Sequence, residues 1–146
     1  MSFSNRRDAI TEILTLFKTA WVTTAGQSGD RVKYDNVGKS SLPPDGNLPW
    51  ARVVLRHTGS NQASLSGEVG TRRFQRNGLL TIQIFVPPGK GLAEAVDIPK
   101  IIQDAYEGQT TAGGAWFRDV TINEIGSDGN FYQTNVIALF EYDEIK

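Results

Sequence analysis

The sequence predicts an α+β domain, in which two helices pack on one face of a mainly antiparallel sheet and an extended loop or β-hairpin arm projects from it. Three observations predict this class. Two stretches repeat apolar residues at helical spacing, other stretches alternate apolar and polar residues, and their order is helix, strands, helix, hairpin. The 146 residues suffice for one hydrophobic core, and we see no repeat or linker. We therefore expect a single domain over residues 1–146.

The first helix is expected to begin after Ser4 or Asn5, either of which can cap it. Asp8 falls in the first turn, where a negative charge is favoured. A short extended segment is expected at residues 31–34, after a break at residues 25–30. The apolar positions of this helix are Ile10, Ile13, Leu14, Phe17 and Trp21.

Two long strands are expected in the middle of the chain. Trp50 begins the first, in which alternate residues face opposite sides of the sheet. The second runs from Gly78 to Val86, and Pro87 and Pro88 end it because they lack backbone donors. We expect this second strand to be central. Leu80, Ile82, Ile84 and Val86 share one of its faces, opposite Leu79, Thr81, Gln83 and Phe85.

Residues 59–70 are polar and rich in glycine, and residues 71–76 could extend the following strand. This pattern predicts a mobile arm or a long hairpin. We expect residues 59–70 to be disordered in the isolated protein and ordered in an assembly, because their composition cannot offset the entropy of ordering them.

The second helix is expected within residues 92–106, with Gly108 as the left-handed residue after it. Pro99 should kink this helix or divide it in two. A hairpin is then expected from residues 116–125 and 131–142, followed by an acidic tail. The apolar stripe of the helix comprises Leu92, Ala95, Val96, Ile98, Ile101, Ile102, Ala105 and Tyr106.

The composition excludes several classes of function. The formal charge is −1, from 15 basic and 16 acidic residues, so no global field attracts nucleic acid or an anionic membrane. The chain has no Cys, and therefore no disulfide framework or thiolate nucleophile. No run of about 18 apolar residues could span a bilayer, so we expect no membrane partner and synthesis in the cytoplasm.

Few residues suit catalysis or cofactor binding. Gly89, Lys90 and Gly91 follow a strand and precede a helix, but Glu94 occupies the third glycine position of a dinucleotide fingerprint, so a simple reversing turn is favoured. His57 is the only histidine and is expected to be a surface or partly buried structural residue. We nominate no catalytic, cofactor-binding or metal-binding residue, and expect no cofactor.

The acidic pairs permit acid and base chemistry in principle. Solubility of an edge strand explains Asp119 and Glu124 more simply, and a solvated tail explains Glu141, Asp143 and Glu144. An enzyme using carboxylates alone therefore stays a minor alternative.

One local basic cluster remains, formed by Arg72, Arg73 and Arg76 with Phe74 between them. Arginines beside an aromatic ring can grip phosphates or stack on bases. The favoured alternative is an exposed strand extension whose arginines pair with carboxylates of a neighbouring subunit.

Three aromatic residues at strand starts, Trp50, Trp116 and Phe117, are suited either to an interface or to the core of the domain. The sequence leaves these two possibilities equally open.

The order of these segments resembles the tail terminator, or tail completion, proteins of long-tailed phages. The resemblance is carried by the amphipathic helix ending near Trp21, by residues 34–37 and 49–55, by the glycine-containing arm, by residues 78–91 and by the second helix. Its motifs are short and mostly structural, and Pro99 departs from the family's pattern.

The resemblance implies an α+β protein that forms a homohexameric ring on the tail tube, stops its growth and faces the head. The implied partners are other copies of the chain, the tail tube protein and a head completion or connector protein, with genomic DNA only as passing cargo. The arm and the loop of residues 38–48, which includes Lys39 and Leu42, become interface candidates. A neighbouring neck component is the closest alternative, and a nucleic-acid binding module is another.

Overall fold

The computed structural model describes residues 5–34, 48–64, 67–88, 92–127 and 131–146. Its elements match the predicted order of helix, strands, helix and hairpin. They are α1 (Arg6–Thr19), a π-helical turn (Ala20–Thr24), a 3₁₀ turn (Gly29–Arg31), β1 (Val32–Tyr34), β2 (Trp50–Gln62), β3 (Arg73–Val86), α2 (Leu92–Tyr106), β4 (Trp116–Ser127) and β5 (Tyr132–Ile145).

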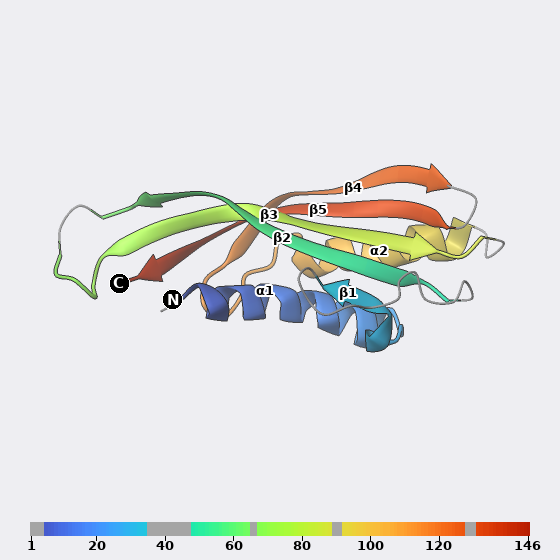
Figure 1. The fold of residues 1–146 in the computed structure, drawn as a ribbon, viewed down its shortest axis with the longest axis horizontal. Helices are drawn as coiled ribbons and strands as arrows, with labels where there is room; N and C mark the ends of the chain where they lie inside the picture. The colour runs from blue at the N-terminus through green and yellow to red at the C-terminus, as the bar shows by residue number, and fades with distance from the viewer. Residues whose placement is uncertain (1–4, 35–47, 65–66, 89–91, 128–130) are drawn as a thin grey trace.

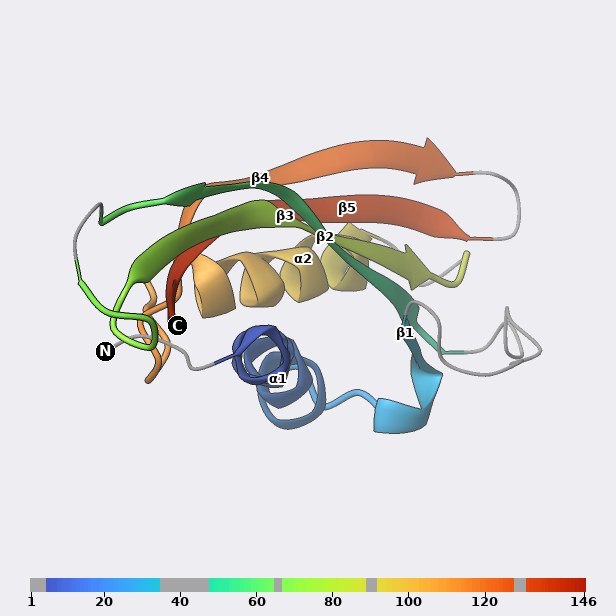
Figure 2. The same ribbon diagram turned by 60° about the vertical axis from the view of Figure 1, so that its left-hand side comes forward.

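The strands form one five-stranded sheet in the order β1-β2-β3-β5-β4. β1 pairs with β2 in parallel, and every other pairing is antiparallel. Both helices lie on the same side of this curved sheet (Figure 1, Figure 2). The predicted α+β class is confirmed, and β3 is the central strand, as its alternation predicted.

α1 begins where the sequence indicated. The Asn5 side chain accepts a hydrogen bond of 2.8 Å from the Asp8 amide, which identifies Asn5 as the N-cap. Ile13, Phe17 and Trp21 are completely buried against the sheet. These three positions of the predicted stripe are buried, whereas Ile10 and Leu14 are only partly buried.

α2 passes through Pro99 as one helix, so the predicted division is wrong. Ile98 and Ile102 on its inner face are buried in the core, and this packing offsets the backbone hydrogen bond that Pro99 cannot donate. Val96 is 56% exposed, so its place in the predicted stripe is also wrong. Gly108 has a φ of 74°, which confirms the left-handed position after the helix.

The hydrophobic core lies between the helices and the inward face of β3 and β5. Leu80, Ile82 and Ile84 of β3, which were predicted to share one face, are 0–1% exposed. On β5 the inward face carries Thr134, Val136, Ala138, Phe140 and Tyr142. Tyr106 joins the two helices, because its hydroxyl donates a 2.9 Å hydrogen bond to the carbonyl of Ile13.

β2 and β3 continue past this core as a long hairpin (Figure 1). Residues 59–62 pair with residues 74–77, so they form strand, and the disorder expected for residues 59–70 is wrong for this part. Residues 38–47 of the predicted loop lie outside the described residues.

Candidate interaction surface

The feature that stands out from the domain is the part of the hairpin beyond a β-bulge between His57 and Gly59. We call residues 59–77 the arm. The arm and the end of β5 extend past the first turn of α1, outside the layer that the helices cover (Figure 1). β5 pairs with the arm up to Arg73↔Ile145, so the base of the arm is three strands wide.

Gly78 lies where the arm meets the core, at a point of close packing. A Cβ atom at this position would collide with the carbonyl oxygen of Arg56 and with the ring of Phe140. Phe140 therefore packs directly against the backbone of β3, and only glycine fits there.

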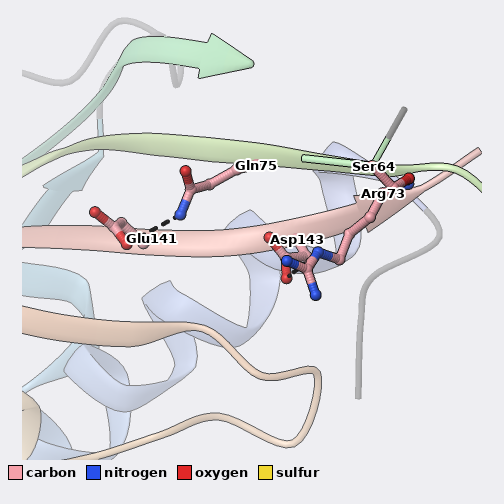
Figure 3. Close-up of polar contacts among 5 residues, drawn as sticks. All are labelled: Ser64, Arg73, Gln75, Glu141 and Asp143. Carbon is pink, nitrogen blue, oxygen red and sulfur yellow. Dashed lines mark hydrogen bonds and ion pairs between the residues drawn. The ribbon is translucent and has the colours of Figure 1, made fainter. Parts of the chain in front are cut away.

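Two arginines of the basic cluster, Arg73 and Arg76, pair with carboxylates of the same chain. Arg76 places both Nε and Nη2 3.0 Å from the Glu144 carboxylate, and its side chain is only 17% exposed. Arg73 lies 3.3 Å from Asp143 and is more exposed (Figure 3). The expectation that these arginines pair with a neighbouring subunit is therefore corrected, because β5 already supplies their carboxylates.

The remaining members of the cluster also have local partners. Arg72 donates from Nε to the carbonyl of Gly67 over 3.0 Å. The ring of Phe74 lies between two cations, with the guanidinium of Arg76 5.3 Å and the ammonium of Lys146 5.4 Å from its centroid.

The predicted acidic tail is part of β5 rather than a solvated tail. Glu141 and Glu144 are each 9% exposed. Glu141 lies 2.8 Å from the guanidinium of Arg118 and accepts a 3.3 Å hydrogen bond from Gln75 (Figure 3). Asp119 and Glu124 are exposed on β4, an edge strand, as predicted.

His57 lies at the base of the arm on the face that carries the helices, beside a hollow of about 510 Å³. Its Nε2 is 2.6 Å from the Tyr142 hydroxyl, and its ring meets Phe140 edge-on. Burial, with a contribution from Arg6 and Arg76, lowers the pKa of His57, and burial raises the pKa of Tyr142. The prediction of a partly buried structural histidine is confirmed.

The three aromatic residues divide between core and surface. Trp50 is 4% exposed and stacks on Phe85 with centroids 4.1 Å apart. Phe117 is 6% exposed and packs against Tyr106. Trp116 is 42% exposed, with the guanidinium of Arg118 5.8 Å from its centroid. Among these three, Trp116 alone offers a large exposed surface to a partner.

One exposed side chain was missed by the sequence reasoning. Val69, at the tip of the arm, is 83% exposed, more than the other exposed large hydrophobic side chains of the described residues. The available signal was a single β-branched apolar residue inside a polar, glycine-rich stretch.

Several nominated positions lie outside the described residues, namely Lys39, Leu42 and residues 89–91. In the described part of the chain, no group of three or more His, Asp or Glu side chains is placed to hold a metal ion. No helix there has both the length and the apolar character needed to cross a membrane.

Comparison with known proteins finds structural likeness only. No family model and no curated protein matches the sequence. A solved protein whose name states no function matches with a TM-score of 0.59 and 12% identity, over 90% of this chain and 94% of that chain. This likeness shows that the whole fold, and not a fragment of it, recurs in another protein.

A second solved chain belongs to the virion of a native gene transfer agent (GTA) particle. It matches with a TM-score of 0.48 and 14% identity, over 91% of this chain and 92% of that chain. Agreement at this level carries no argument about what this chain does.

Proposed function

We propose that this chain is a structural virion protein that forms a homo-oligomeric ring, hexameric by resemblance, at the head-proximal end of a phage tail tube. The ring ends polymerisation of the tube and offers a surface to the head, in the neck region of the virion. The protein does this without catalysis and without a cofactor. The observation that carries the proposal is the arm, a strand extension beyond a core that is already closed without it.

The arm is difficult to explain as part of a monomer. Ordering a residue costs about 1–2 kcal/mol of backbone entropy, and burial of side chains normally offsets this cost. The side chains of residues 59–63 and 67–71 are exposed, so they gain little from the domain itself. A ring needs two different patches on each copy, and a projecting arm supplies one of them.

The nucleic-acid alternative is weakened by the contacts of the arginines. Arg73 and Arg76 face Asp143 and Glu144, so two of the three arginines already have a carboxylate partner that competes with phosphates. Genomic DNA is accordingly proposed only as cargo that passes through the ring.

The proposal is tested by assembling particles without this protein. We expect tail tubes of uncontrolled, greater length, seen by negative-stain electron microscopy, and normal length when the wild-type protein is restored. Tails of normal length that fail to join heads would contradict the proposal and indicate a head completion or connector protein instead.

A further inference from the structure

The tip of the arm is a turn with fixed geometry. The amide of Thr71 donates to the carbonyl of Glu68 over 3.0 Å, and the Thr71 hydroxyl donates to the same oxygen over 2.7 Å. Gly70 has a φ of 99°, whereas Val69 is not among the described residues with positive φ. This combination defines a type II turn with Val69 at its second position.

The turn holds Val69 away from the domain. The Nε of Arg72 closes the base of the turn on the carbonyl of Gly67, so the backbone on both sides is constrained. Val69 is 83% exposed, so the described residues leave most of it uncovered. A β-branched side chain on a fixed apex keeps little rotamer freedom, so little entropy is lost when it is buried by a partner.

The same domain carries an apolar hollow of about 150 Å³ beside α1, where β1 ends and β2 runs on. A valine side chain is small enough to enter a hollow of this size. Among the described residues the lining comprises Ile10, Leu14, Tyr34, Val53 and Leu55, whose side chains are apolar apart from the tyrosine hydroxyl.

The charges around the two features are complementary. Arg6 and Arg7 line an adjoining hollow that shares Ile10 with the first, so the rim on this side is positive. Glu68 precedes Val69 in the turn and presents the opposite charge. An insertion of Val69 therefore brings Glu68 towards these arginines.

The tip cannot reach the hollow of its own chain. Gln62, at the end of β2, lies seven residues beyond Leu55 in the same strand. That separation is about 23 Å along a paired strand, and the tip lies farther still. A tip that enters this hollow must therefore belong to another copy.

We propose that Val69 of one copy inserts into the hollow between α1 and β2 of the next copy, with Glu68 against Arg6 and Arg7. The contact joins two different patches, so repetition around a closed rotation produces a ring. This contact rests on the proposed function in one respect, namely that the copies form a closed ring.

Cross-linking tests the contact directly, because the chain has no Cys and each variant therefore carries a single thiol. Tagged Val69→Cys protein is mixed with untagged Ile10→Cys protein under mild oxidation. The control mixture replaces tagged Val69→Cys by tagged Val96→Cys, a matched valine that is 56% exposed on α2. We expect the mixture with Val69→Cys to yield at least about tenfold more disulfide-linked heterodimer than the control mixture. Equal yields from the two mixtures would overturn the contact.

A second measurement uses the assembly equilibrium of the full-length protein. Val69→Asp should raise the concentration needed for half-assembly by about tenfold or more, since a charge replaces the valine that the proposed contact buries. Val69→Ile and Val96→Asp should leave this concentration within about threefold of the wild type.

The outcomes separate this contact from the proposed function. Unchanged assembly of Val69→Asp, with tubes still ended at normal length, overturns the contact and leaves the ring intact. A wild-type chain that stays monomeric at every concentration also overturns the contact. The proposed function is then tested separately, by the length of the tail tubes assembled without this protein.

Discussion

At Gly78 the sheet has no room for a side chain, because the carbonyl of Arg56 and the ring of Phe140 occupy the space. We expect Gly78→Ala to lower the free energy of unfolding by about 2 kcal/mol or more, since backbone cannot easily move away. Urea denaturation measures this change. Gly29→Ala is the matched control, because its Cβ would lie 3.6 Å from the Val22 side chain, and a change within about 0.5 kcal/mol is expected. Equal effects of the two variants would contradict this packing.

The two ion pairs at the base of the arm should differ in strength. Glu144 and Arg76 have side chains 12% and 17% exposed, whereas Arg73 opposite Asp143 is 55% exposed. Glu144→Gln should therefore cost about 1.5–3 kcal/mol of stability, and Asp143→Asn less than about 1 kcal/mol. Chemical denaturation of both variants measures the difference, and a larger loss for Asp143→Asn would refute this order.

His57 should make stability depend on pH. Its pKa is lowered from the usual 6.5 by burial and by nearby cations, so the unfolded chain binds a proton more readily than the folded chain. The free energy of unfolding should therefore fall as the pH drops below about 6.5, and level off once folded His57 is itself protonated.

Denaturation curves between pH 7.5 and 5 measure this dependence. His57→Gln should flatten the slope in this window, where carboxylates contribute little. A slope that is the same in the variant and the wild type would exclude His57 as its source.

The residues of the basic cluster could be identified from the sequence, but the carboxylates that pair with its arginines could not. Arg76 and Glu144 lie 68 residues apart, and only the register of β3 on β5 brings them together. The sequence gives the alternation of a strand but not this register, which is why the tail was expected to be solvated.

At the scale of secondary structure, strongly periodic segments were predictable. The stripe of α1 and the alternation of β3 each bury one face, and burial of that face dominates their stability. α2 was predicted less well, because local rules allow Pro99 either to kink the helix or to divide it, whereas the packing of Ile98 and Ile102 keeps one helix.

The arm provides a prediction at this scale. In the isolated protein the amides of β3 from Phe74 to Asn77 should be protected, because strands pair with them on both sides. Residues 67–72 lie outside the strands and should exchange faster. Ring formation should then slow their exchange by tenfold or more, while that of Phe74–Asn77 changes little.

Hydrogen exchange with mass spectrometry, on the isolated and assembled protein, measures this effect. The same protection of residues 67–72 in both states would contradict a role for the tip in assembly.

At the scale of the molecule, the chain combines a closed core with a projecting arm. Helices and sheet bury most of the apolar residues in one core, whereas the arm carries an exposed apex. This contrast between a packed core and an exposed projection is the reason we propose a role in assembly. The sequence predicted the arm, but it could not show that Arg73 and Arg76 pair with carboxylates of β5 or that Val69 is the exposed hydrophobic residue at the tip.

The central claim is that identical copies join and close the end of a tail tube. The most direct measurement is the solution mass by multi-angle light scattering, first of the protein alone over a range of concentrations and then with purified tail tubes. We expect a concentration-dependent rise to a defined oligomer and a fixed amount of protein bound per tube end. A constant monomer mass together with no binding to tubes would contradict the account.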